Sequence, residues 1–418
     1  MLRGVGRGRG YSACVESPRN LSAVESRVCA RLSERREAML TDLKRYVAIP
    51  TKTGHVPGLD EFRGLVCARM ERLGANVKLV PGDPQPEWLY GGTPGGVPAV
   101  TAVCGHAAGR PGKRFLLSGH LDTVHPPEIS FRELSVSTDG KTATGPGCVD
   151  MKGGLIVAMH ALEALAEIGT DLAWTFVFNS DEETGSYNSE RTLASESAQH
   201  DYGLVFEPAM LGGELAVERM GSGQFILEVH GRAAHVGREF FEGVSAVTAL
   251  AERLVTIGRM PDPTAKRIVN IGPVEGGSAT NVVPDLARAW GNVRFPTSEQ
   301  ADELSRMLDA LATTDDALPR VVVRKSFIRP AKPLTPTTEA LALAARGAAE
   351  SLGQKLPFGT TGGVCDGNIL QHAGLPTIDT LGVRGGGLHT LKEWVEVPSL
   401  VERSQLLAVL MLRLSETA

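Results

Sequence analysis

The sequence predicts an α/β protein, in which a mostly parallel β-sheet is flanked by helices and a small α+β domain is inserted. Three observations lead to this expectation. Segments with strand and helix patterns alternate between residues 34 and 207. Residues 223–328 then follow the order β-α-β-β-α-β, which is typical of a ferredoxin-like unit. Finally, the chain has 418 residues, enough for two or three domains, and its 48 glycines indicate many tight turns.

The first part of the chain predicts helices and short strands in turn. Residues 34–48 place Met39, Leu43 and Val47 on one helical face, and Pro50 ends the helix. Residues 154–169 form a second strongly apolar helical segment, which opens just after a glycine-rich turn. We also expect a helix over 59–74 and strands over 77–80, 98–104, 114–118, 173–180 and 202–207.

The pattern changes near Glu218, where Phe225, Leu227 and Val229 alternate as in a half-buried strand. We expect the inserted domain to contain strands over 223–230, 266–274, 285–295 and 320–328 and helices over 243–258 and 299–312. A proline-bearing stretch then leads into a helix over 337–352 and a strand over 376–381. The expected segments are a disordered tail (1–33), the main domain (34–217 and 331–418) and the inserted domain (218–330).

Composition excludes several classes of protein. The net charge of −5 leaves no basic footprint for nucleic acid. The longest apolar stretches, such as 406–412, are far shorter than the ~20 residues that span a bilayer. The six cysteines are scattered without CxxC spacing, which favours reduced thiols. The Arg- and Gly-rich start lacks the apolar core of a secretory signal, and a targeting role is the alternative to a disordered tail. We therefore expect a soluble, cytoplasmic protein.

Acidic and imidazole side chains gather at predicted strand ends and glycine-rich turns. Loops that follow the strands of an open α/β sheet are where ligands bind. A lone histidine beside a turn is more often structural, but several such segments in one domain indicate a shared site. The segments are SGHLDTV (118–124), GPGCVDMKGG (145–154), NSDEETGS (179–186), FEP (206–208) and GGGLHT (385–390).

Imidazoles and carboxylates without a cysteine cluster suit a divalent metal, with zinc favoured and manganese or cobalt as alternatives. His120 and Asp122 pair a metal ligand with a carboxylate that can hold the other ring nitrogen. Asp150 lies between glycines, in the rigid turn that a carboxylate bridging two ions needs. Glu182 and Glu183 are adjacent and point to different sides, so that one can bind metal while the other moves protons.

With these motifs the sequence resembles the dinuclear zinc metallopeptidase family that includes glutamate carboxypeptidase, aminoacylase, acetylornithine deacetylase and succinyl-diaminopimelate desuccinylase. The resemblance covers roughly residues 35–415. It implies two Zn²⁺ ions per subunit, with Co²⁺ or Mn²⁺ as possible substitutes, and a cis peptide between Asp150 and Met151. The implied ligands are His120 and Glu207 for one ion, Glu183 and His389 for the other, and Asp150 as the bridge, with Asp122 orienting His120 and Glu182 as general base.

The inserted domain resembles the lid and dimerisation domain of the same family. His235, in HGRAAHVG (230–237), matches the histidine that polarises the scissile carbonyl. Asn281 and Arg294 match a pair that grips the free carboxylate of the substrate, a role suited to the planar guanidinium. In relatives the lids pair, so that each reaches the metals of its partner. The resemblance therefore implies a homodimer formed through this domain.

Two further motifs bear on the reaction. The stretch GGVCDGN (362–368) looks closest to the glutamate carboxypeptidase branch and departs from it at Cys365, where serine or threonine is more usual. Glutamate in FEP is typical of relatives that are carboxypeptidases or acyl-amino-acid deacylases. We expect hydrolysis of an amide bond next to a free carboxylate, releasing the C-terminal amino acid of a small peptide. The alternatives are an N-acyl-amino-acid deacylase and an inactive metal-binding protein, and complete retention of ligands and base disfavours the latter.

Overall fold

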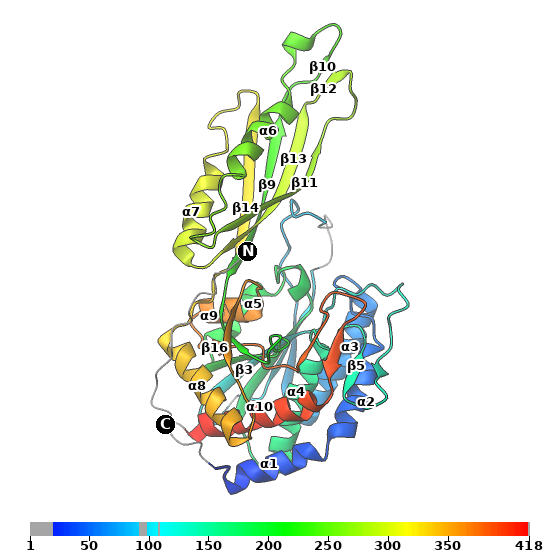
Figure 1. Cartoon of the computed structure of the whole chain (residues 1–418), viewed down its shortest axis with the longest axis vertical. Helices are drawn as coiled ribbons and strands as arrows, with labels where there is room; N and C mark the ends of the chain where they lie inside the picture. The colour runs from blue at the N-terminus through cyan, green and yellow to red at the C-terminus, as the bar shows by residue number, and fades with distance from the viewer. Residues whose placement is uncertain (1–19, 92–97, 108, 417–418) are drawn as a thin grey trace, which may run out of the picture.

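The computed structural model describes residues 20–91, 98–107 and 109–416. They form two units, a main unit and an inserted unit (residues 221–329), which lie end to end (Figure 1). The main unit is built on a six-stranded sheet with the order β1-β2-β6-β3-β7-β16. Its strands are β1 (Asn76–Val80), β2 (Thr101–Gly105), β3 (Arg114–His120), β6 (Ala173–Asn179), β7 (Tyr202–Val205) and β16 (Thr377–Ile378).

The sheet is mostly parallel, as predicted. β3 is parallel to both of its neighbours, β6 and β7, and β16 is parallel to β7. Only β2 runs against its neighbours in this sheet, β1 and β6. A smaller four-stranded sheet contains β4 (Ser135–Val136), β5 (Thr142–Thr144), β17 (Gly385–Gly386) and β18 (Trp394–Glu396). A two-stranded sheet pairs β8 (Leu215–Arg219) with β15 (Phe358–Thr361).

Helices cover both faces of the main sheet because successive strand side chains point to opposite faces. Phe115 and Leu117 of β3 belong to the large core, whereas Leu116 packs with Leu193 and Ile369 on the other face. The large core is completed by α1 (Ala23–Ser33), α2 (Arg36–Val47), α3 (Val56–Arg72), α4 (Lys152–Glu167), α8 (Pro336–Ser351) and α10 (Pro398–Glu416). The opposite face is covered by α5 (Glu190–Ser197) and α9 (Asp366–His372).

The N-terminal segment corrects one expectation. Residues 23–33 were predicted to be disordered but form α1, which packs against α4 and α10. The helix starts with a capping box between Ser22 and Glu25, and it buries Val28 and Leu32 completely. The remainder of the predicted tail, residues 1–19, lies outside the described residues.

The inserted unit has the β-α-β-β-α-β order that the sequence predicts. Its four-stranded sheet has the order β11-β13-β9-β14, and all neighbouring strands are antiparallel. It has its own core, in which Phe225, Leu227 and Leu304 are fully buried. A short antiparallel pair of strands, β10 and β12, extends from its far end (Figure 1). The elements are β9 (Gly221–His230), β10 (Ala234–His235), α6 (Ala246–Ile257), β11 (Ile268–Gly276), β12 (Val282–Val283), β13 (Leu286–Phe295), α7 (Ser298–Asp309) and β14 (Arg320–Arg329).

The described part of the chain bears on the expectations about membrane-spanning segments and cysteines. Across residues 20–91, 98–107 and 109–416, we find no helix with both the length and the apolar character needed to cross a membrane. Five of the cysteines, at positions 29, 67, 104, 148 and 365, are free and buried. Cys14 falls outside the described residues.

Candidate metal centre and active site

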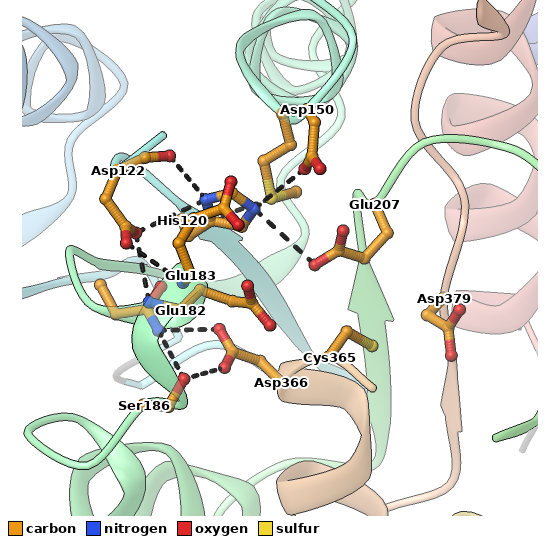
Figure 2. A network of polar contacts seen from close by, with 12 residues as sticks. His120, Asp122, Asp150, Glu182, Glu183, Ser186, Glu207, Cys365, Asp366 and Asp379 are labelled. Carbon is orange, nitrogen blue, oxygen red and sulfur yellow. Dashed lines mark hydrogen bonds and ion pairs between the residues drawn. The ribbon is translucent and has the colours of Figure 1, made fainter. Parts of the chain in front are cut away.

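Four of the five predicted ligands converge with the predicted base at the carboxyl edge of the main sheet (Figure 2). The fifth, His389, approaches them from the loop between β17 and β18. His120 is the last residue of β3, and Glu182 and Glu183 open a short 3₁₀ helix that follows β6. Glu207 follows the end of β7, and Asp150 precedes α4. Because β3, β6 and β7 are parallel neighbours, their ends bring these side chains together.

Asp150 is the centre of the cluster, and its two carboxylate oxygens face different histidines. Oδ1 lies 3.2 Å from Nε2 of His120, and Oδ2 lies 3.4 Å from Nε2 of His389. His120 Nε2 is also 3.9 Å from Glu207 Oε1, and His389 Nε2 is 3.2 Å from Glu183 Oε2. The arrangement thus has two halves that share Asp150, which is the pairing that the resemblance implies. The Asp150–Met151 peptide is cis, as expected.

The polar atoms of the cluster fit divalent cations. Four of them are buried and make no hydrogen bond, although three of the four lie within 3.9 Å of another: His120 Nε2, Asp150 Oδ1, Glu183 Oε1 and Glu207 Oε1. Buried polar atoms are otherwise almost always paired, so that such a set needs an additional partner. Two groups of side chains among the described residues are spaced to hold a metal ion. They are His120, Asp150 and Glu183, and His120, Glu182 and Glu207.

The electrostatics of the cluster point in the same direction. Burial raises the pKa of Glu183 to about 7 and that of Glu207 well above its usual value. Hydrogen bonds to Asp150 and Glu183 raise the pKa of His389 to about 10. Several buried carboxylates in one small volume are costly unless cations neutralise them. Metal ions of charge +2 would provide that neutralisation.

Asp122 organises the site in a slightly different way from the prediction. Its backbone carbonyl, rather than its carboxylate, accepts the closest bond from His120 Nδ1, at 2.9 Å, while Oδ1 lies 3.5 Å away. The carboxylate accepts the backbone N–H groups of Glu182 and Glu183, at 3.2 and 3.1 Å, and the hydroxyl of Thr53. Asp122 therefore holds the loop that carries the predicted base and one predicted ligand.

Glu393 is a supporting residue that the sequence reading missed. Its buried carboxylate accepts the backbone N–H groups of Gly147, Val149 and Asp150, at 2.9 to 3.0 Å, and faces His125 Nε2 at 2.8 Å. The bonds fix the loop that carries the bridging aspartate. An isolated glutamate is ordinarily a solvated charge, so its residue type does not indicate a supporting role. The only indication in the sequence is that Glu393 lies four residues after His389.

Arg329 and Asp366 were also missed, although both adjoin the predicted base. Arg329, the last residue of β14, donates from Nη2 to Glu182 Oε1 at 2.9 Å and to Ser186 Oγ at 2.7 Å. Asp366 accepts the Ser186 hydroxyl at 2.6 Å and lies 3.4 Å from Arg329 Nη2. Asp366 belongs to the GGVCDGN stretch, which the sequence assigned only to a branch of the family.

The three predicted residues of the inserted unit do not lie together. His235 and Asn281 adjoin at the far end, where the Val236 N–H donates to the Asn281 carbonyl. The antiparallel β10–β12 pair beside them points away from the main unit (Figure 1). Arg294 lies near the other end of the sheet, opposite Ser222, and its Nη1 is buried with no partner among the described residues. Burial and the nearby Arg329 lower the pKa of Arg294.

Similarity to known proteins agrees with this geometry. The model of the Peptidase family M20/M25/M40 matches residues 116–413, a range that contains all the predicted ligands. The chain belongs to this family. It is therefore a hydrolase of the M20 metallopeptidase class, and the cluster of imidazoles and carboxylates is where the family's divalent metals fit.

Relatives within the M20/M25/M40 family have more than one activity in their names. Carboxypeptidase G2 of a Pseudomonas species is 28% identical over 396 residues, covering 91% of this chain and 90% of its own. A succinyl-diaminopimelate desuccinylase of Magnetococcus marinus is 27% identical, covering 70% of this chain and 81% of its own. Among solved structures, a Staphylococcus aureus tripeptidase matches with a TM-score of 0.73 at 24% identity, covering 91% of this chain and 99% of its own, which supports the fold.

Proposed function

We propose that this M20 protein is a metal-dependent carboxypeptidase, which hydrolyses the amide bond next to a free carboxylate and releases the C-terminal amino acid. One observation carries the proposal: Asp150 presents one oxygen to His120 and the other to His389, between two pairs of potential ligands. Two divalent ions bound there, zinc first and cobalt or manganese as substitutes, would acidify a water molecule and polarise the scissile carbonyl.

Glu182 is proposed as the general base. It lies within the group of His120 and Glu207, but its Oε1 already accepts a bond from Arg329, whereas Oε1 of Glu207 has no partner. This difference supports a proton-transfer role for Glu182 and a ligand role for Glu207. Glu182 takes the proton of the attacking water and delivers it to the nitrogen of the leaving amine, so that atoms and charge balance.

Arg294 is proposed to bind the carboxylate of the substrate. Its guanidinium has a buried, unpaired N–H group close to Arg329, and a carboxylate is the anion that best fits such a donor. We propose that His235 and Asn281 complete the site from the partner subunit of a homodimer, because both lie at the far end of their own inserted unit. His235 would then donate to the oxyanion that forms from the scissile carbonyl.

The second candidate is an N-acyl-amino-acid deacylase, which the similarity to a desuccinylase favours. Both reactions need the same centre and the same carboxylate, and they differ in the group on the acyl side of the amide bond. We place either reaction in the cytoplasm, because five free, buried cysteines suit a reducing compartment.

A turnover assay with matched substrates tests the proposal. Metal-reconstituted protein is given dipeptides and tripeptides, the same peptides with an amidated C-terminus, and N-acetyl and N-succinyl amino acids. We expect release of the C-terminal amino acid from the free peptides and none from the amidated ones. Preferential cleavage of the N-acyl amino acids would establish the deacylase instead. Cleavage of amidated peptides at the same rate would refute the role given to the carboxylate.

A further inference from the structure

The two chain segments that connect the inserted unit to the main unit are braced together. Arg219 and Lys332 form a pair of backbone hydrogen bonds, 2.9 and 3.0 Å long, across the two connections. Beside this pair, one residue after Arg219 and two residues before Lys332, the carboxamide of Asn368 donates to the Met220 carbonyl at 2.9 Å and to the Pro330 carbonyl at 2.7 Å. Asn368 is fully buried and lies in the first turn of α9. A single side chain therefore ties both connections to the main unit.

Arg329 stands immediately beside this brace and extends to the loop of the predicted base. Its side chain is 2% exposed. Besides Glu182 Oε1 and Ser186 Oγ, its guanidinium donates to the carbonyls of Glu182 and Gly185, at 3.2 and 3.4 Å. The contacts to Glu182 and Gly185 span the whole 3₁₀ turn on which Glu182 sits. The last residue of an inserted-unit strand thus fixes both the backbone and the carboxylate of the base.

Asp366 holds the other side of Arg329. Its Oδ1 accepts the Ser186 hydroxyl and faces Arg329, and its Oδ2 accepts from the Asn179 side chain at 2.8 Å. Asp366 and Asn368 are in the same turn of α9, so that one turn of helix supports both the base loop and the brace. In Figure 2, Asp366 lies on the side of Glu182 that is opposite to His120.

We propose that Arg329, held by Asp366, is a positioning residue that fixes Glu182 for proton transfer and links its position to the connection with the inserted unit. The proposal rests on the proposed function, because it assumes that Glu182 moves the proton. When a guanidinium fixes one oxygen of a carboxylate, the other oxygen is held in one orientation for accepting a proton. Without Arg329 the carboxylate is free to rotate, and a misplacement of about 1 Å costs about 10²-fold in rate.

Matched variants test this proposal in the metal-reconstituted full chain. Arg329→Ala removes the contacts, and Arg324→Ala removes an exposed arginine of the same strand and serves as the control. We expect kcat to fall by about 10²-fold for Arg329→Ala with KM changed by less than about threefold, and neither constant to change in the control. Millimolar methylguanidinium should restore part of the kcat of Arg329→Ala only.

The alternative is that Arg329 contacts the substrate directly, because its Nη1 has no partner among the described residues. In that case KM rises while kcat is retained, and the proposal is overturned. Asp366→Asn is the second variant, and it stays informative if Arg329→Ala does not fold. Asp366 reaches Arg329 and Ser186, so its substitution should lower kcat without raising KM; a retained kcat would overturn the proposal.

Hydrogen exchange of the base loop gives a readout that does not depend on activity. The amides of Glu182 and Glu183 donate to Asp122 and should exchange faster in Arg329→Ala than in the wild type or in Arg324→Ala. Equal exchange in all three proteins would overturn the positioning role. If the wild-type protein hydrolyses none of the test substrates, the proposed function fails, while the exchange measurement still decides whether Arg329 orders the loop.

Discussion

The position of His235 predicts that each active site is shared between two subunits. Within one chain, β9 runs from Gly221, beside the brace, to His230, and His235 lies beyond it in β10. Ten residues at about 3.3 Å each place β10 about 30 Å from the brace. Glu182 contacts Arg329, which lies next to that brace. An imidazole must lie within about 3 Å of the oxyanion that it stabilises, so His235 of the same chain is too distant in this arrangement.

Subunit complementation measures this directly. Glu182→Gln and His235→Ala are each expected to be nearly inactive. When they are mixed under conditions that allow exchange, half of the dimers contain one chain of each kind. In such a dimer one site carries both lesions, and the other combines an intact Glu182 with an intact histidine from the partner. About a quarter of the wild-type activity should therefore return.

The assay is initial-rate hydrolysis of the best substrate, with mass spectrometry of differently labelled chains to verify exchange. The control is a mixture of Glu182→Gln with Glu183→Gln. Both residues lie in the same loop of the same chain, so every site of a mixed dimer carries one of the two lesions. We expect no recovery from this control. If the mixture of Glu182→Gln and His235→Ala also shows no recovery despite verified exchange, the shared site is refuted.

Three further predictions follow from the metal centre and from the N-terminal helix. Saturation with zinc should give two ions per chain by elemental analysis and raise the thermal midpoint of unfolding, and chelation should reverse both; a firm value of one ion would contradict the dinuclear centre. Glu182→Gln should retain both ions and lose about 10²- to 10⁴-fold in kcat, whereas Glu183→Gln should lose metal; the reverse pattern would exchange their roles. Leu32→Ala should lower the free energy of unfolding by about 2–5 kcal/mol, because Leu32 is fully buried, and Arg27→Ala on the exposed side of the same helix should have little effect in chemical denaturation. Equal stability of the two variants would show that α1 does not contribute to the core.

The sequence by itself predicted the fold class and the chemistry of the centre. Period-two and helical patterns revealed most strands and helices, because burial of one face leaves its trace in the order of apolar residues. The motifs predicted to bind metal were visible because each occupies a short stretch at a strand end, as with His120 at the end of β3 and Glu207 after β7. Local sequence also explains why Asp150 stands in a tight turn between glycines.

Sequence patterns failed where stabilisation comes from distant segments. Helix α1 looks polar, and its order depends on contacts with α4 and α10. Helices α5 and α9 are short, and they are held chiefly by the second face of the sheet. Isolated helices of this length are marginal in water, so that tertiary packing, rather than propensity, determines whether they form.

The supporting residues of the site were determined by tertiary structure alone. Glu393 is 243 positions from the Asp150 amide that it accepts, and Arg329 is 147 positions from Glu182. Each belongs to a residue type that is ordinarily exposed, and only the fold makes it a buried partner. Candidate ligands could be proposed from the sequence because metal chemistry restricts residue type and local spacing. Their supports could not be read, because a hydrogen bond across the fold restricts only the final distance between two groups.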